Sequence, residues 1–206
     1  MQFRKLGHTG MEVSEISFGA WQLGSSNDWG SMDDGTAHSL VHDAIDCGIN
    51  LFDTAPKYAS TNSERLLGEA LAGRRHHVVL VSKFGHRPEG PKDFSVDWFW
   101  ESLDGSLRRL RTHYLDVLLL HNPDPAMYAG IDPLWDALEV ARRRGKIRRY
   151  GASVDHAAEI EACLTNTRSE VLEVLFNIFH QDTRRAFPLV RRRKCGIIAK
   201  VPLDSG

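Results

Sequence analysis

Four ionisable side chains, Asp53, Tyr58, Lys83 and His121, lie at or just beyond the ends of three short apolar segments. A tyrosine hydroxyl has a pKa of about 10, so it is a weak acid at neutral pH unless a nearby cation favours its phenolate. Lys83 can supply that cation, and Asp53 can hold the lysine in place through an ion pair. His121 can then hydrogen-bond a substrate oxygen and orient it toward Tyr58.

This set of side chains is suited to transferring a proton to an oxygen that becomes an alkoxide in the transition state. The sequence places no serine or thiol nucleophile beside a base. The cysteines at 47, 163 and 195 have neither CxxC nor zinc spacing, so we expect no metal site and no disulfide framework. With nucleophilic and metal-dependent mechanisms set aside, these residues suit the reduction of a carbonyl group.

Each of the four residues also has a simpler interpretation. Asp53 can cap a turn, and Lys83 can extend from a strand end into solvent. Tyr58 can be an amphipathic loop residue, and His121 can be a hydrogen-bonded turn residue before Asn122. Because all four follow successive apolar segments in the same way, we favour one shared site over four unrelated roles.

Short runs of β-branched and aliphatic residues alternate with segments of helical period, which is typical of βα units and a parallel sheet. Several runs are almost continuously apolar, as strands buried on both faces are. We expect each strand to be followed by a helix. The seven expected strands are 16–21, 49–55, 77–85, 115–121, 148–154, 170–177 and 196–202.

The spacing of these units approaches the (βα)8 barrel, in which reactive groups lie at the C-terminal ends of strands. The predicted fold class is therefore α/β, of the (βα)8 TIM-barrel type but incomplete, with about seven βα units. We expect residues 1–206 to form a single barrel domain that lacks its C-terminal part. The segment before the first unit predicts a small β-hairpin around residues 8–10, outside the main sheet.

Helix boundaries can be predicted from capping residues. Ser95 precedes an apolar face and is a good N-cap, and Asp132 followed by Pro133 combines a cap with a first-turn proline. Phe187 and Pro188 predict the start of a short later helix. Basic runs at the predicted helix ends are interpreted as charges that complement the helix dipole.

The overall composition favours a small-molecule partner. Lys plus Arg number 26 and Asp plus Glu 27, so the net charge of −1 gives no electrostatic reason to expect nucleic acid or an anionic membrane. The N-terminus lacks an apolar signal-peptide stretch, and no apolar run is long enough to span a bilayer. We therefore expect a cytoplasmic protein, whose oligomeric state the sequence does not indicate.

Six motifs, in order along the chain, resemble those of the aldo-keto reductases, which are (βα)8 barrels that bind NAD(P)(H) without a Rossmann fold. The combination is much more specific than any single pattern. The motifs are FDTAPKY at 52–58, VSKFG at 81–85, LDVLLLHNP at 115–123, GASV at 151–154, FNIFHQ at 176–181 and VPLDSG at 201–206.

The resemblance implies roles for the residues that match these motifs. Tyr58 would be the general acid in reduction and the base in oxidation, with Lys83 and Asp53 tuning it. His121 would position the carbonyl of an aldehyde or ketone, or the hydroxyl of the alcohol in the reverse reaction. Trp21 would form an aromatic wall, and Asn122 would also lie at the substrate.

The resemblance further implies a set of residues around the cofactor. Ser153 would bind the carboxamide, while Glu173 stands where a glutamine is usual and Lys200 where a stacking tyrosine is usual. These two departures, with Val154 after the serine, point to a divergent bacterial-type subgroup. The family favours NADP(H) over NAD(H). The expected cofactor residues are Gly19, Ala20, Asp53, Ser153, Glu173, Lys200, Pro202, Leu203 and Ser205.

Two other functions stay open at this point. A catalytically incompetent, truncated homologue would act as a nucleotide- or protein-binding module. A hydrolase or aldolase of the same barrel type would use Lys83 as a Schiff-base nucleophile.

Overall fold

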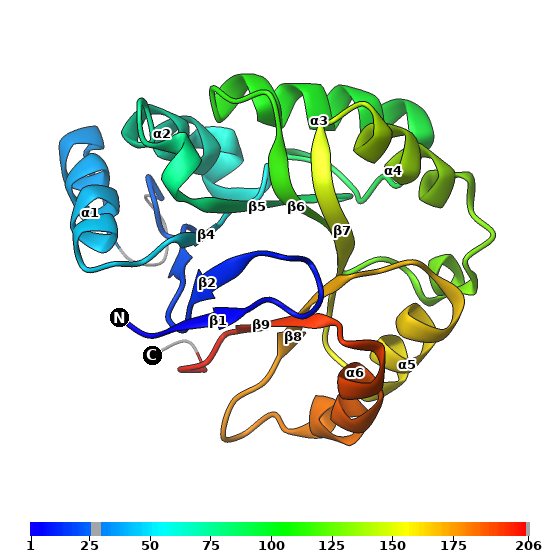
Figure 1. The fold of residues 1–206 in the computed structure, drawn as a ribbon. Coiled ribbons are helices and arrows are strands. Elements are labelled where there is room, and N and C mark those ends of the chain that lie inside the picture. The colour runs from blue at the N-terminus through cyan, green and yellow to red at the C-terminus, as the bar shows by residue number, and fades with distance from the viewer. Residues whose placement is uncertain (26–29, 205–206) are drawn as a thin grey trace.

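The computed structural model describes residues 1–25 and 30–204, and its main feature is a seven-stranded parallel sheet that curls around an interior (Figure 1). The strands lie side by side in chain order, as successive βα units require. They are β3 (Phe18–Gly19), β4 (Leu51–Asp53), β5 (Val79–Phe84), β6 (Leu115–His121), β7 (Ile147–Val154), β8 (Val171–Leu175) and β9 (Gly196–Lys200).

Six helices follow the first six strands of this sheet and lie on its outer side (Figure 1). This arrangement confirms the predicted incomplete barrel of βα units. Within residues 30–204 no helix follows β9. The helices are α1 (Asp34–Asp46), α2 (Asn62–Ala70), α3 (Val96–Arg109), α4 (Pro133–Arg143), α5 (Ala157–Asn166) and α6 (Phe187–Arg193).

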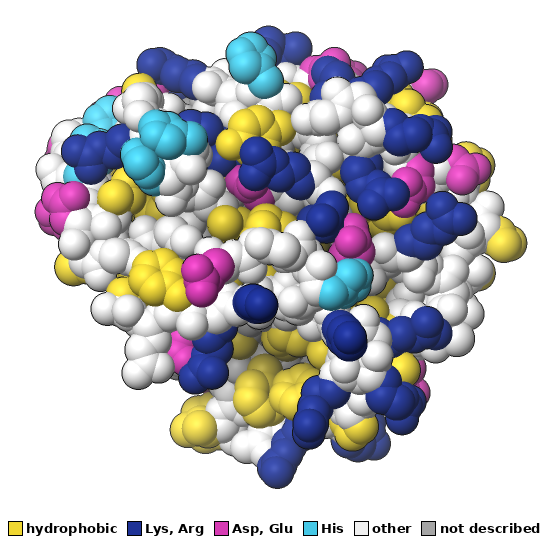
Figure 2. Space-filling model, viewed as in Figure 1, with side chains coloured by type: hydrophobic (Ala, Val, Ile, Leu, Met, Phe, Trp, Pro, Cys, Tyr) yellow, Lys and Arg dark blue, Asp and Glu magenta, His cyan; other side chains and the backbone are white. Residues whose placement is uncertain are grey.

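The predicted helix caps are present. The Ser95 hydroxyl accepts a hydrogen bond from the backbone N–H of Trp98, and the Asp132 carboxylate accepts one from that of Leu134. Arginines occupy the last turns of α3, α4 and α6, where they complement the helix dipole. Figure 2, viewed from the same side, shows Lys and Arg mixed with Asp and Glu over the upper part of this face, whereas Lys and Arg predominate at the lower right, around α6.

Alternate residues of each strand face opposite sides of the sheet and form two apolar clusters. One cluster fills the space between sheet and helices, and includes Leu118 and Leu120 of β6. The other fills the interior of the curl, and includes Val117 and Leu119. His121, two residues beyond Leu119, therefore lies on the interior side at the C-terminal end of its strand.

The predicted hairpin is confirmed as a separate antiparallel pair of β1 (Phe3–Lys5) and β2 (Glu12–Ser14). Leu6 and Val13 of this hairpin belong to the interior cluster. The backbone of His8 binds Lys194, just before β9, so the hairpin lies at the N-terminal ends of the strands. The hairpin therefore does not cover the polar groups at the C-terminal ends of the strands.

Five of the seven predicted strands are shorter in the structure: those expected at 16–21, 49–55, 77–85, 170–177 and 196–202. The segment expected at 16–21 pairs only at Phe18 and Gly19, after which residues 21–24 form a turn. The segment expected at 196–202 ends at Lys200, because Val201 adopts a φ of 53° and leaves the extended region.

No helix in residues 1–25 and 30–204 is long and apolar enough to cross a membrane. The same described residues contain no group of three or more His, Cys, Asp or Glu placed to hold a metal ion.

Candidate active site

Strand parity brings the polar residues at the C-terminal ends of the strands into the interior. Asp53 lies two residues beyond the interior Leu51, and Lys83 lies two beyond the interior Val81. Glu173 lies two beyond Val171 on β8 in the same way. The sheet thus directs charged side chains from separate strands toward one region.

Lys83 is fully buried and lies between two carboxylates. Its Nζ is 2.7 Å from Oδ1 and 2.5 Å from Oδ2 of Asp53, and 3.5 Å from Oε1 of Glu173. It also donates to the carbonyl oxygen of Thr54 at 3.3 Å. Such a buried ammonium is stable only with partners of this kind, because desolvating an unpaired charge costs several kcal/mol.

The charges in this cluster shift one another's pKa values. Burial alone lowers the pKa of Lys83, but Asp53 and Glu173 outweigh it and the pKa is raised above its ordinary value. Burial raises the pKa of Asp53 to about 7, although Lys83 opposes that change. Lys83 is therefore a permanent cation at neutral pH.

Tyr58 follows β4 at the start of a one-turn 3-10 segment, η1 (Tyr58–Thr61), whose backbone is left-handed. The φ angles of Ala59, Ser60 and Thr61 are 47°, 49° and 77°. Residues with a Cβ rarely adopt such angles, and three in succession store conformational strain. The strained turn sets the direction of the tyrosine ring, whose centroid is 5.0 Å from Lys83 Nζ.

The pKa of Tyr58 is raised, whereas the sequence led us to expect that Lys83 would lower it. Lys83 does lower it, as the sequence indicated, but burial acts in the opposite direction and is the larger effect. With further contributions from Asp53 and Glu173, the pKa of Tyr58 is raised to about 12. The hydroxyl therefore carries its proton throughout the neutral range.

His121 faces Tyr58 with ring centroids 6.0 Å apart and the rings almost perpendicular. Burial, followed by Lys83, lowers the pKa of His121 to about 2, so its imidazole is neutral. A neutral imidazole has one N–H donor. Tyr58 and His121 can therefore both donate hydrogen bonds to one oxygen between them.

A second imidazole, from His86, stacks on His121 at 4.3 Å with an interplanar angle of 17°. Its Nε2 is buried and has no hydrogen-bond partner among the described residues. Sequence reasoning missed His86. It lies three residues beyond Lys83, so the strand-end rule that selected Lys83 could also have found it.

Four polar residues form a network beside the imidazole pair. Lys200 Nζ donates to Ser153 Oγ at 2.8 Å and to Asn122 Oδ1 at 3.3 Å, and pairs with Asp155 Oδ1 at 2.8 Å. Asn122 Nδ2 donates to Asp155 Oδ2 at 2.8 Å. Asp155, directly after β7, was also missed by sequence reasoning. Lys200 is thus a cation held by its neighbours.

The remaining residues predicted to contact cofactor or substrate lie at the C-terminal ends of β3 and β9. Gly19 is exposed, Ala20 is fully buried, and Trp21 is 48% exposed. Pro202 and Leu203 are exposed beyond β9. Ser205 lies outside the described residues.

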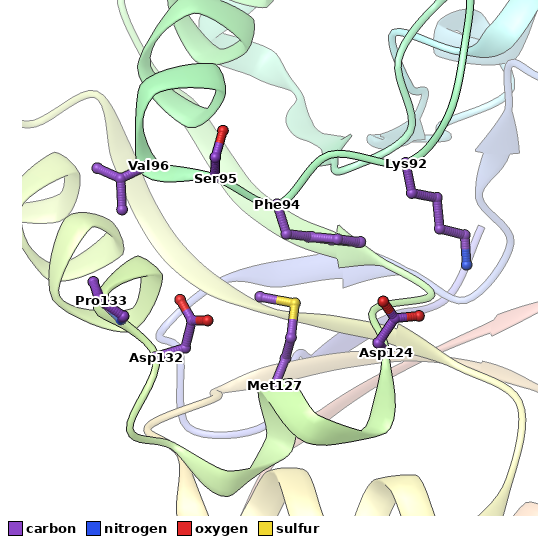
Figure 3. Close-up of a pocket in the computed structure, with 8 residues that line it drawn as sticks. All are labelled: Lys92, Phe94, Ser95, Val96, Asp124, Met127, Asp132 and Pro133. Carbon is purple, nitrogen blue, oxygen red and sulfur yellow. The ribbon is translucent and has the colours of Figure 1, made fainter.

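Figure 3 shows a cavity of about 450 Å³ that is lined by none of Asp53, Tyr58, Lys83 and His121. It is bounded by the segment before α3 and the segment before α4. Phe94 and Met127 supply apolar side chains, and Lys92 lies at one end. Lys92 Nζ donates to the backbone oxygen of Asn122, the residue after His121, so the cavity adjoins the site.

Comparison with known proteins accounts for this arrangement. The family model described as "Aldo/keto reductase family" matches residues 15–206. The chain belongs to the aldo/keto reductase family. An aldo/keto reductase barrel explains why polar side chains gather at the C-terminal ends of the strands while the hairpin covers the other end.

Individual aldo/keto reductase relatives match over the whole chain. The chain is 29% identical to the uncharacterized oxidoreductase YqkF of Bacillus subtilis (strain 168) and 30% identical to L-galactose dehydrogenase of Arabidopsis thaliana. It covers 66% of the length of each. The holo form of aldo-keto reductase AKR11C1 from Bacillus halodurans matches with a TM-score of 0.89 at 29% identity, over 100% of this chain and 68% of that one. The chain spans about half to two thirds of the length of the curated relatives it matches.

Proposed function

We propose that the protein reduces an aldehyde or ketone, or oxidises the corresponding alcohol, by hydride transfer with NAD(P)(H). The observation that carries the proposal is the pair of facing donors, Tyr58 and His121, beside the buried ammonium of Lys83. Membership of the aldo/keto reductase family supports the same chemistry.

The chain's own residues would bind the carbonyl oxygen and protonate it. The neutral His121 imidazole and the Tyr58 hydroxyl each donate a hydrogen bond to that oxygen, which polarises the carbonyl. Bound NAD(P)H supplies the hydride that reduces the carbonyl carbon. As negative charge develops on the oxygen, Tyr58 transfers its proton there, and the Lys83 cation stabilises the resulting phenolate.

Glu173 and Ser153 fit the carboxamide of a nicotinamide. The Oε2 atom of Glu173 is buried and lacks a hydrogen-bond partner among the described residues, so it can accept the carboxamide N–H groups. Ser153 neighbours Glu173 across β7 and β8, and its hydroxyl hydrogen remains available for the carboxamide oxygen. We propose NADP(H) rather than NAD(H) as the cofactor, on the family's preference, and the whole chain as one barrel domain.

A Schiff-base mechanism is disfavoured by the same geometry. An amine must be deprotonated to attack a carbonyl. Lys83 is held as an ammonium by two carboxylates, and its pKa is raised.

The test is to follow NADPH absorbance with a panel of aldehydes, for the chain and for Tyr58→Phe. We expect loss of about two to four orders of magnitude in kcat, the range for removing a general acid. Tyr114→Phe is a matched control, since Tyr114 lies near the N-terminal end of β6. Unchanged turnover in Tyr58→Phe would refute the proposal, and cofactor binding without any turnover would favour a binding module.

A further inference from the structure

Two lysines beside the imidazole pair have ammonium groups that bind backbone carbonyls. Lys57 Nζ donates to Pro88 O at 3.1 Å, and Lys92 Nζ donates to Asn122 O at 2.8 Å. Both side chains are exposed, and neither forms an ion pair with the residues in 1–25 and 30–204. An ammonium has three N–H donors, so each lysine keeps donors for an anion.

Three lysines lie close enough to His86 to lower the pKa of its imidazole. After burial, the largest effects on the pKa of His86 come from Lys92, Lys57 and Lys200, and all three lower it. Lys200 is neutralised by Asp155 at 2.8 Å. Within residues 1–25 and 30–204, neither Lys57 nor Lys92 forms an ion pair with a carboxylate, so their charges are less compensated than that of Lys200.

The deeper part of the site has the opposite balance. There the single cation Lys83 faces the two carboxylates of Asp53 and Glu173. An anionic group on a substrate would be repelled from this inner end and attracted to the outer lysines. The charge distribution therefore gives a substrate one preferred direction.

The adjoining cavity supplies apolar space next to one of these two lysines, Lys92. Phe94 and Met127 lie across it, and Lys92 and Asp124 lie at one end (Figure 3). Asp124 forms no ion pair with Lys92, and its side chain caps no backbone N–H of the adjacent 3-10 turn, η3 (Pro125–Ala129). Its negative charge opposes that of the lysines without being needed for the turn.

We propose that the natural substrate is a carbonyl compound with an anionic group, which binds Lys57 and Lys92 while its carbonyl lies between Tyr58 and His121. This inference rests on the proposed function and adds the substrate class to it.

The test compares two aldehydes of the same shape, 4-carboxybenzaldehyde and its neutral isostere 4-carbamoylbenzaldehyde, at saturating NADPH. The expected ratio of kcat/KM favours the carboxylate by about fivefold or more at low salt and falls at high salt. In the Lys57→Gln/Lys92→Gln variant we expect the ratio to fall about five- to tenfold.

Two further variants serve as controls. Asp124→Asn removes a negative charge and should raise the ratio. Lys5→Gln, on the exposed hairpin strand β1 at the other end of the barrel, should leave it unchanged. A ratio near one in the unmodified chain, or an unchanged ratio in the double lysine variant, would overturn the inference while leaving carbonyl reduction intact.

Absence of turnover with both aldehydes would contradict the proposed function. Binding of an anionic group can still be measured in that case, without turnover. Calorimetric titration compares benzoate with benzamide. We expect benzoate to bind the chain more tightly, and the double lysine variant to lose that preference. Equal affinity for benzoate and benzamide in the unmodified chain would overturn the inference.

Discussion

Glu173 Oε1 lies 3.5 Å from Lys83 Nζ, so the buried ammonium next to Tyr58 faces a second carboxylate in addition to Asp53. This second carboxylate changes the expected chemistry of the tyrosine. Glu173 raises the pKa of Tyr58, in the same direction as burial and Asp53. The site is therefore set to keep the Tyr58 hydroxyl protonated, which suits a proton donor in carbonyl reduction.

Glu173→Gln removes that charge and keeps the size of the side chain. The pKa of Tyr58 should fall, so the phenolate needed for alcohol oxidation forms at lower pH. We expect the rise of kcat/KM for oxidation with pH, which follows formation of the phenolate, to begin about one pH unit lower. The pH profile is measured with a neutral alcohol, and Glu12→Gln on the hairpin is the control. An unmoved profile would show that Glu173 does not act on Tyr58.

His121 should make the fold less stable in acid. Burial lowers its pKa to about 2 from an ordinary 6.5, so below pH 6.5 the unfolded chain binds a proton that the folded chain does not. Stability from this residue is complete above that pH and is lost as the pH falls. In His121→Asn, the loss of unfolding free energy between pH 7 and pH 5 should be smaller by about 2 kcal/mol.

Urea titrations at the two pH values measure this difference. His113→Asn, at an exposed position, is the matched control. Equal pH dependence of the His121 variant and the unmodified chain would mean that His121 is protonated in the folded state.

The features that sequence reasoning predicted are those set by local patterns. The strand at 115–121 coincides with β6, and Ser95 and Asp132 cap their helices, because periodicity and capping depend on neighbouring residues. The period of two along each strand also explains why Asp53 and His121 come to lie on the same interior side.

The features that it missed depend on several elements packing together. The stack of His86 on His121 joins the loop after β5 to the end of β6, and the ion pair of Lys200 with Asp155 joins the ends of β9 and β7. The pKa of Tyr58 reflects the sum of burial and several charges, which no motif encodes.

Gly19 offers a way to locate the cofactor. A Cβ added there meets no atom within 4 Å, so the fold itself does not require glycine at this position. Gly19→Ala should leave the unfolding free energy within about 0.5 kcal/mol and weaken NADPH binding about tenfold if the cofactor lies against this backbone. Fluorescence titration measures the affinity. Unchanged affinity would exclude Gly19 from the cofactor site.

Gly151 is the control for Gly19, because here an added methyl group should disturb the fold itself. A Cβ there would lie 1.7 Å from the carbonyl oxygen of Val171, so Gly151→Ala must force β7 and β8 apart. We expect that variant to be destabilised by at least about 3 kcal/mol, by overpacking and loss of strand pairing.

The left-handed turn after Tyr58 predicts an unusual stabilising substitution. Ala59 has φ and ψ of 47° and 40°, a conformation that costs an L-residue about 1–2 kcal/mol and glycine almost nothing. Ala59→Gly should therefore raise the unfolding free energy by about 0.5–1 kcal/mol, after allowing for the greater freedom of glycine in the unfolded chain. The same substitution at Ala162, inside α5, should lower it by about 1 kcal/mol. Urea unfolding of the two variants measures both effects. Equal destabilisation by the two substitutions would show that the turn is not strained and that Tyr58 is oriented by its ring contacts alone.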